Sequence, residues 1–161
     1  MKLMSFDQSM SKSGWALFDY ESKTLLDCGI IENLSYKSLT REDAIHKMAS
    51  DLLYVAKMEE AELFSYEDVY LDTNRNRSNV QLPMLAGAIV GMFKSYNDSL
   101  IFPVAATKWK SYCGIKGKKR EEQKKNTIEF VKNQFGIKTK EDICDAIAQG
   151  WTVVNTIKIK F

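Results

Sequence analysis

Residues 2–32 read KLMSFDQSMSKSGWALFDYESKTLLDCGIIE, and they contain three short apolar runs separated by polar stretches of a few residues. The runs begin near Lys2, Trp15 and Thr24, and the polar stretches between them are QSMSKSG and ESK. Short apolar runs with connections of this length are typical of an antiparallel meander. The stretch therefore predicts three consecutive antiparallel strands.

The rest of the chain alternates between helical and strand patterns. Thr40, followed by Asp43, marks the start of a helix, and Pro83 falls in the first turn of another, where a missing N–H costs little. Three strands followed by alternating helices and strands predict an α/β fold with a mixed sheet. No repeat or linker interrupts the pattern, so we expect one domain over residues 1–161. The further elements expected are a helix over about 40–64, a strand over 68–72, a helix over about 80–96, a strand over 100–104, a short segment around 108–112, and helices over about 119–135 and 141–155.

The overall composition excludes several classes of protein. Hydrophobic residues make up 45% and charged residues 27% of the chain, a balance that excludes intrinsic disorder. No window approaches 18 uncharged apolar residues, and MKLMSFDQ contains no apolar run of signal-peptide length, so we expect a cytoplasmic protein without a membrane span. Three cysteines in no CxxC pattern, with a single histidine, argue against a zinc site and for reduced thiols.

The net charge of +2 conceals an uneven distribution along the chain. Residues 108–140 contain eleven Lys or Arg and three Glu, whereas the other residues contain twelve Lys or Arg and eighteen Asp or Glu. A basic surface that meets a polyanion would explain this asymmetry, and so would a solvated helix face rich in lysine. Charge alone leaves both interpretations open.

Four aspartates occupy positions that suit a common site. Asp142 and Asp145 are three residues apart, which places both on one flank of the last expected helix. Asp7 and Asp72 each end an expected strand, where an open α/β sheet presents its ligand site. Taken singly, each has an ordinary explanation, since acids are favoured near helix N-termini and aspartate commonly forms turns.

Taken together, four carboxylates in one site require cations. Mg²⁺ is the natural occupant because it prefers carboxylate and water oxygens. Two such ions suit in-line hydrolysis of a phosphodiester, and the basic stretch 108–140 would hold the phosphates. The acids and the basic stretch together predict a metal-dependent nuclease.

Three segments resemble the motifs of one family. SFDQSMSKSGWALFD (5–19) resembles a first motif in which a hydrophobic strand leads to Asp-Gln-Ser and a small turn. DVYLDTNRNRSN (68–79) is similar to a second motif, a strand that ends on an acid and continues into a polar loop. EDICDAIAQGW (141–151) resembles a third, an Asp-x-x-Asp-Ala helix. The family is that of the RuvC-type Holliday-junction resolvases, especially the phage-like branch, and the order and spacing match over nearly the whole chain.

The resemblance implies a ribonuclease H-like fold, with a mixed five-stranded sheet flanked by helices. It implies a homodimer that cuts four-way junctions, and other branched DNA, symmetrically. The helix over 80–96 falls where the family dimerises, and Gly87 and Gly91 would allow close approach there; helix packing within one chain explains these glycines equally well. The metal ligands carried over, for two Mg²⁺ ions that Mn²⁺ can replace, are Asp7, Asp72, Asp142 and Asp145.

The same resemblance assigns the contacts to DNA. The basic run 116–125 falls where the family places its DNA-contacting lysines, and Lys116 or Lys119 would stabilise the charge that develops during cleavage. Trp109 and Tyr112 lie beside lysines, and would either stack on unpaired bases or anchor the core. The expected DNA-binding residues are Arg75, Arg77, Lys108, Lys110, Lys116, Lys118, Lys119, Arg120, Lys124 and Lys125.

The sequence departs from the family's pattern in two places. The second acid of the family is usually glutamate, whereas the expected residue here is Asp72. The loop 73–79 lacks the aromatic residue that bacterial members often carry there, and Arg75 and Arg77 offer charge instead. We therefore expect weak sequence preference and broad tolerance of branched structures, as in a virus that debranches its DNA before packaging.

Three other functions are alternatives to a junction-resolving nuclease. A nuclease for RNA–DNA hybrids or flaps would use the same acids, because phosphate contacts carry no substrate identity. An ATP-handling domain of the actin or sugar-kinase type needs glycine-rich phosphate loops, and the eight glycines form no GxG, which argues against it. A branched-DNA-binding protein with a weakened or inactive site would follow if Asp72 disables catalysis.

Overall fold

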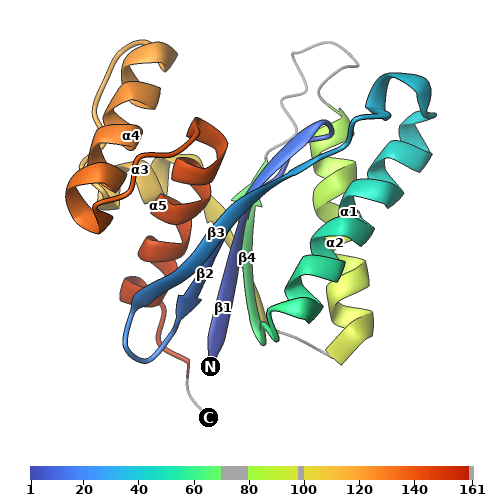
Figure 1. The fold of residues 1–161 in the computed structure, drawn as a ribbon, viewed down its shortest axis with the longest axis horizontal. Helices are drawn as coiled ribbons and strands as arrows, with labels where there is room; N and C mark the ends of the chain where they lie inside the picture. The colour runs from blue at the N-terminus through green and yellow to red at the C-terminus, as the bar shows by residue number, and fades with distance from the viewer. Residues whose placement is uncertain (70–79, 98–99, 160–161) are drawn as a thin grey trace.

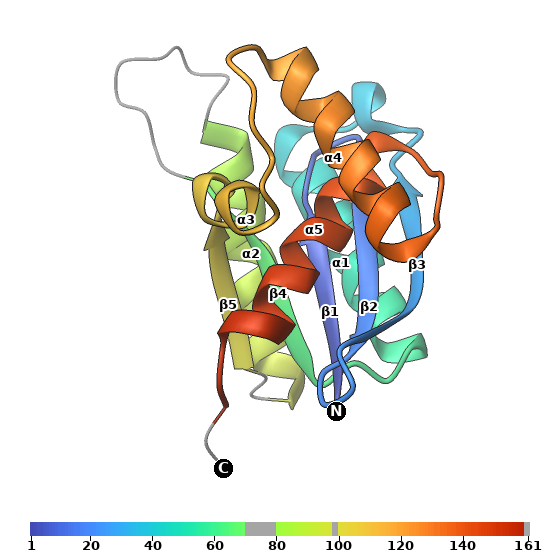
Figure 2. The same ribbon diagram turned by 90° about the vertical axis from the view of Figure 1, so that its left-hand side faces the viewer.

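A five-stranded mixed sheet lies between two layers of helices (Figure 1, Figure 2). The computed structural model describes residues 1–69, 80–97 and 100–159. The strand order is β3-β2-β1-β4-β5, with β1 antiparallel to β2, β2 antiparallel to β3, and β4 parallel to both β1 and β5. The predicted mixed five-stranded sheet is thus confirmed. The strands are β1 (Lys2–Asp7), β2 (Lys12–Asp19), β3 (Thr24–Glu32), β4 (Leu63–Asp68) and β5 (Leu100–Ala105).

Each face of the sheet is covered by its own set of helices (Figure 1). Alternate strand residues point to opposite faces, so Met4 and Phe6 pack on one face and Leu3 on the other. The Met4 face is covered by α1 (Arg41–Met58) and α2 (Gln81–Asn97). The Leu3 face is covered by α3 (Ala106–Tyr112), α4 (Arg120–Phe135) and α5 (Glu141–Thr156). None of the described helices is long and apolar enough to cross a membrane.

Two glycines allow α5 to lie directly on the sheet. A Cβ added at Gly14, in β2, would overlap the main-chain carbonyl of Asp142 at the start of α5. A Cβ added at Gly150 would lie 2.5 Å from Ser5 Oγ and 2.6 Å from the ring of Phe18. Ser5 Oγ also donates a hydrogen bond of 2.6 Å to the Ala146 carbonyl. The first turn of α5 is therefore held against the end of β1 and the start of β2.

Most predicted elements are confirmed, and the end of one helix and the start of the next strand are wrong. Thr40 caps α1 as expected, because its Oγ1 accepts a hydrogen bond of 3.1 Å from the Asp43 amide. The helix ends at Met58 rather than near residue 64, and β4 occupies Leu63–Asp68. Residues 70–72 of the expected strand 68–72 lie outside the described residues. The helical spacing of Ile45, Ala49, Leu52, Leu53 and Ala56 predicts a helix to about residue 64, a range that includes Leu63 and Phe64. They are instead buried in a parallel ladder with β1.

Candidate functional site

The parallel pairing of β1 and β4 brings two acids to one end of the sheet. In the register, Ser5 lies opposite Ser65 and Phe6 opposite Tyr66, so Asp7 and Glu67 come next on the two strands. Side chains alternate along a strand, so these two acids share the face of Ser5, which is covered by α5. The carboxyl ends of two neighbouring strands therefore each present a carboxylate toward α5.

The first two turns of α5 supply the other acids. Its apolar residues, Ile143, Ala146 and Ile147 among them, are buried against the sheet, which leaves the acidic flank facing the strand ends. The result is a cleft of about 390 Å³, here called the carboxylate cleft. Five carboxylates line it: Asp7, Glu67, Glu141, Asp142 and Asp145. Five residues from α3 and α4 complete it: Lys110, Arg120, Gln123, Lys124 and Thr127.

Two acids of the carboxylate cleft, Asp7 and Asp145, have raised pKa values. Burial, reinforced by the charges of Asp145, Glu67 and Asp142, raises the pKa of Asp7 well above its usual value. Burial, followed by the charges of Glu141 and Glu67, raises the pKa of Asp145 to about 7, against the opposing effect of Lys110. The neighbouring cations therefore do not neutralise the cluster, and the ionised form of these two acids calls for further positive charge.

The chemistry of the donor set fits a hard divalent cation. Among the described residues, no three His, Cys, Asp or Glu side chains are arranged as a ready-made ligand set for one ion. The cleft nevertheless offers carboxylate oxygens, and its lining contains neither a cysteine nor a histidine. Carboxylate oxygens are ligands that suit Mg²⁺ or Mn²⁺ rather than zinc. Cys144, between Asp142 and Asp145 in sequence, is buried, and burial raises the pKa of its thiol to about 12.

Two of the three cations in the cleft are tied to neighbours. Lys110 Nζ donates a hydrogen bond of 3.2 Å to Gln123 Oε1, and it lies 5.1 Å from the centre of the Trp109 ring. Lys124 Nζ forms an ion pair of 2.6 Å with Glu141 Oε1, which joins α4 to α5. The cleft therefore has an acidic wall from the sheet and α5 and a basic wall from α3 and α4.

The expected basic residues fall into three groups. Lys110, Arg120 and Lys124 line the carboxylate cleft. Arg75 and Arg77 lie outside the described residues. The others are exposed and do not line the cleft, including the two expected to stabilise charge during cleavage; they are Lys108, Lys116, Lys118, Lys119 and Lys125.

Glu67 is the strand-end acid that the sequence pattern does not predict, and Gln123, Thr127 and Glu141 are further unexpected residues of the cleft lining. Of the four expected acids, Asp7, Asp142 and Asp145 lie together, and Asp72 lies outside the described residues. Because the strand was expected five residues too late, its terminal acid was taken as Asp72. The missed signal was the alternation in LFSYED (63–68), which puts Leu63, Ser65 and Glu67 on one face. A glutamate at this place also agrees with the second motif of the resembling family.

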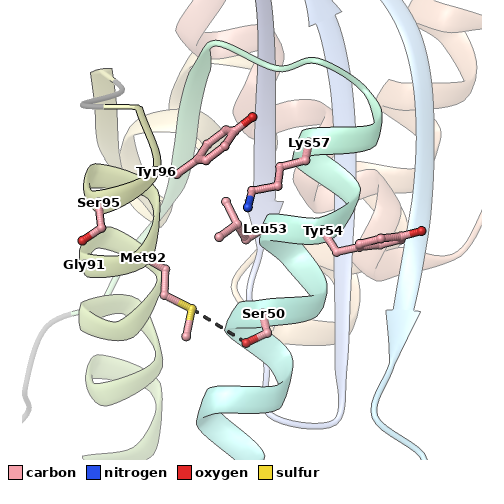
Figure 3. A pocket seen from close by; sticks show the side chains of 8 residues that line it. All are labelled: Ser50, Leu53, Tyr54, Lys57, Gly91, Met92, Ser95 and Tyr96. Atoms are coloured by element: carbon pink, nitrogen blue, oxygen red, sulfur yellow. Dashed lines mark hydrogen bonds between the residues drawn. The ribbon is translucent and has the colours of Figure 1, made fainter.

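A larger cavity, of about 710 Å³, lies on the other face of the sheet, between α1 and α2 (Figure 3). Its walls carry Leu53, Tyr54, Met92 and Tyr96, and its one charged side chain, Lys57, lies 4.3 Å from the centre of the Tyr96 ring. In Figure 3 the Ser50 hydroxyl points toward the Met92 sulfur, at 3.9 Å. The described lining residues of this cavity include the hydroxyls of Ser50 and Ser95 but no carboxylate. The carboxylate cleft, which groups five acids with three cationic side chains, is therefore the candidate site despite its smaller volume.

The sequence matches the profile of a family described as Lactococcus phage M3 protein, over residues 2–158. The chain belongs to this family. No curated protein sequence matches it. Membership of the M3 family agrees with the phage-like character of the first sequence motif.

The M3-family chain shares its fold with solved Holliday-junction resolvases. Thermus thermophilus RuvC in complex with a Holliday junction superposes with a TM-score of 0.73 at 13% identity, over 94% of this chain and 91% of that one. Fowlpox virus resolvase, also solved with Holliday junction DNA, gives 0.62 at 12% identity, over 97% and 98% of the two chains. The yeast mitochondrial Holliday junction resolvase gives 0.59 at 14% identity, over 94% and 78%. The predicted resolvase fold is confirmed.

Proposed function

We propose that this protein is a metal-dependent, structure-selective DNA endonuclease that resolves Holliday junctions and other branched DNA by paired phosphodiester hydrolysis. The observation that carries the proposal is the carboxylate cleft, in which strand-end and helix acids face three cations within a resolvase fold. The whole chain, residues 1–161, would act as one nuclease domain in the cytoplasm of the host cell.

Four acids would hold the metal, with Glu67 in the role expected of Asp72. Asp7 and Glu67 come from neighbouring parallel strands, and Asp142 and Asp145 from α5. The donor set suits two Mg²⁺ ions, with Mn²⁺ as a substitute. When bound, such ions stabilise negative charge on the attacking and leaving oxygens of an in-line displacement. Glu141 is held by Lys124 and would not be needed as a ligand.

The basic wall of the cleft would bind the scissile phosphate. Lys110, Arg120 and Lys124 line the same cleft as the acids, and they would pair with phosphate oxygens and stabilise their developing charge. The exposed lysines outside the cleft would hold the flanking DNA backbone through sequence-independent contacts. This division replaces the expected catalytic role of Lys116 and Lys119 with one for the three cleft residues.

A homodimer would pair two such clefts for symmetric cutting. Its interface would include α2, where a Cβ added at Gly87 or Gly91 meets no atom within 4 Å. The neighbouring surface is partly apolar, with Leu82 and Met84 each more than one third exposed. Two copies joined through this layer would leave the cleft on the opposite face of each sheet free for DNA.

A cleavage assay tests the proposed function. Purified protein would be incubated with a synthetic mobile four-way junction, a fork and a linear duplex, each in Mg²⁺, Mn²⁺ or EDTA. We expect paired nicks in the junction that require the metal and are absent with Asp7→Asn, while the variant still binds the junction. The fork measures the breadth of substrate choice. Tight junction binding without nicks in either metal would support the non-catalytic alternative and overturn the proposed activity.

A further inference from the structure

Two side chains outside the lining of the carboxylate cleft form hydrogen bonds with Glu67, one with its carboxylate and one with its main chain. Trp109, on α3, is 1% exposed, and its indole N–H donates a hydrogen bond of 3.2 Å to Glu67 Oε2. A buried indole N–H requires an acceptor, and here the acceptor is the carboxylate of a residue that lines the cleft. The same ring lies 5.1 Å from Lys110 Nζ. One buried residue thus contacts both the acidic and the basic wall of the cleft.

Gln8 holds the main chain of the same glutamate. Its side chain is 5% exposed, donates a hydrogen bond of 2.6 Å from Nε2 to the Glu67 carbonyl, and accepts one of 3.0 Å at Oε1 from the Glu67 amide. A side-chain amide that pairs with both main-chain groups of one residue imitates a strand. It therefore continues the β1–β4 ladder just past Asp7, where β1 itself has ended.

These hydrogen bonds oppose the electrostatic repulsion between Glu67 and the other acids of the cleft. The Glu67 carboxylate sits among other acids in the cleft, and unrestrained it would turn toward solvent to escape their repulsion. The Trp109 bond holds one carboxylate oxygen, and the Gln8 bonds fix the backbone that carries it. Residues that orient a metal ligand in this way commonly change metal affinity or activity by about 10- to 100-fold when altered.

We propose that Gln8 and Trp109 are positioning residues that hold the Glu67 carboxylate in the cleft for its divalent ion. This inference rests on the proposed function, and it extends the functional part of the molecule to two residues that touch neither metal nor DNA. Because both residues act through Glu67, altering either one should have no further effect on metal affinity once the Glu67 carboxylate is removed.

The first test removes the indole N–H and keeps the ring. Trp109 is replaced site-specifically by the thianaphthene analogue of tryptophan, in which sulfur takes the place of the N–H. Because shape and volume are retained, we expect folding and junction binding to be unchanged. We expect Mn²⁺ affinity, measured by electron paramagnetic resonance or calorimetry, to fall about tenfold, and single-turnover cleavage to fall with it. In a Glu67→Gln background the analogue should have no further effect.

The second test uses Gln8→Met, which keeps the length of the side chain and deletes both hydrogen bonds. Its matched control is Tyr20→Phe, which deletes the two hydrogen bonds of Tyr20 Oη, one of 2.5 Å donated to the Ile157 carbonyl and one of 3.2 Å accepted from the Ile159 amide. Both of these bonds lie beyond the C-terminal end of α5, whereas the cleft lies at its N-terminal end. Both variants should lower the melting temperature, whereas only Gln8→Met should weaken Mn²⁺ binding. Where Gln8→Met does not fold, the analogue at Trp109 decides alone.

The outcomes separate this inference from the proposed function. Wild-type Mn²⁺ affinity and cleavage in the Trp109 analogue would overturn the positioning role while the nuclease stands. An equal loss of Mn²⁺ affinity in Tyr20→Phe would also overturn it, because the effect would then be general destabilisation. A wild-type protein that neither binds Mn²⁺ nor cleaves would overturn both.

Discussion

Asp145 shows how the sheet and α5 create an unfavourable cluster of charge. Burial and the neighbouring Glu141 and Glu67 raise its pKa to about 7, and burial with Asp145, Glu67 and Asp142 raises that of Asp7. An acid with a raised pKa in the folded state costs stability, and the cost grows as pH rises from its unfolded pKa to its folded one. In the metal-free protein, Asp145 should therefore lower stability progressively between about pH 4 and pH 7, and Asp7 should add to that loss as pH rises toward its own raised pKa.

Asp145→Asn tests this cost directly. In EDTA, the variant should gain stability relative to the wild type, and the gain should be greater by about 2 kcal/mol at pH 8 than at pH 5, since one pKa unit corresponds to about 1.4 kcal/mol. Urea unfolding of both proteins at the two pH values measures the difference. Saturating Mg²⁺ should reverse it in favour of the wild type. A gain that is independent of pH would contradict the account.

Lys124 has a structural contact, its ion pair with Glu141, and a proposed role in cleavage, and one substitution measures both. Its ion pair with Glu141 joins two side chains that are about one third exposed, so Lys124→Gln should cost less than about 1 kcal/mol of stability. We expect junction cleavage to fall by at least about tenfold, because a cation that faces the developing charge is lost. The matched control is Lys132→Gln, in the last turn of the same helix and outside the cleft. Equal cleavage by the two variants would argue against a basic catalytic wall.

Local sequence patterns were enough to select three of the acids that the structure brings together in the carboxylate cleft, Asp7, Asp142 and Asp145. The spacing of Asp142 and Asp145 on a helix, and the position of Asp7 after an apolar run, are local features. Glu67 is different, because its role depends on which residues of β4 pair with β1, more than fifty residues earlier. That register is a property of the assembled sheet.

At the scale of elements, the seating of α5 decides where two of the acids lie. Gly14 has no room for a Cβ because the Asp142 carbonyl occupies that space. The position of the acidic flank of α5 therefore depends on the absence of a side chain in β2. In the sequence, the only sign of this contact is a glycine within a strand pattern, which is typical of a close approach by another main chain.

Gly14→Ala should displace the start of α5. We expect a loss of roughly 1–3 kcal/mol in stability, as for an overpacked core, together with a large loss of cleavage as Asp142 moves. Denaturant unfolding and the junction assay measure the two effects. Lys12→Ala is the control on the same strand, since it removes only a surface ion pair of 3.1 Å with Glu32. Cleavage near the wild-type rate in Gly14→Ala would show that the position of Asp142 is not critical.

The boundary of β4 shows the limit of pattern reading for an element. Leu63 and Phe64 continue the helical spacing of α1, so a single-sequence interpretation extends the helix through them. The structure ends the helix at Met58, and Glu60 follows with a positive φ of 55°. The chain then pairs with β1, a contact whose free energy is gained only when the sheet forms.

At the scale of the whole molecule, the two faces of the sheet have different tasks. Helices α3, α4 and α5 lie on one face of the sheet, and α1 and α2 lie on the other (Figure 1). The first three helices line the carboxylate cleft together with the ends of β1 and β4, and α2 carries the proposed dimer surface. The order of elements allowed the mixed sheet to be predicted, because three consecutive strands followed by alternating helices and strands have few other solutions. The fold persists among resolvase structures at 12–14% identity, since many apolar sequences satisfy the same layers.

Gly91→Arg tests the dimer without threatening the monomer. No atom lies within 4 Å of a Cβ added there, so the variant should fold normally. If α2 faces a second copy, the bulky charge should convert a dimer into an 18.4 kDa monomer, as measured by size-exclusion chromatography with light scattering. Paired cuts in the junction should become single nicks. The control is Lys47→Ala, on exposed α1 surface, where only an ion pair with Asp51 is lost. An unchanged mass for Gly91→Arg would place the interface elsewhere.

We propose that the acids of the carboxylate cleft carry out DNA cleavage, with Glu67 rather than Asp72 as the second strand acid. The most direct measurement is the single-turnover rate of four-way-junction cleavage in Mg²⁺ for Glu67→Gln and Asp72→Asn, with junction binding measured in parallel. We predict that Glu67→Gln loses at least about 100-fold in rate, that Asp72→Asn stays within a few-fold of the wild type, and that both bind the junction. Full activity in Glu67→Gln together with a dead Asp72→Asn would contradict the account.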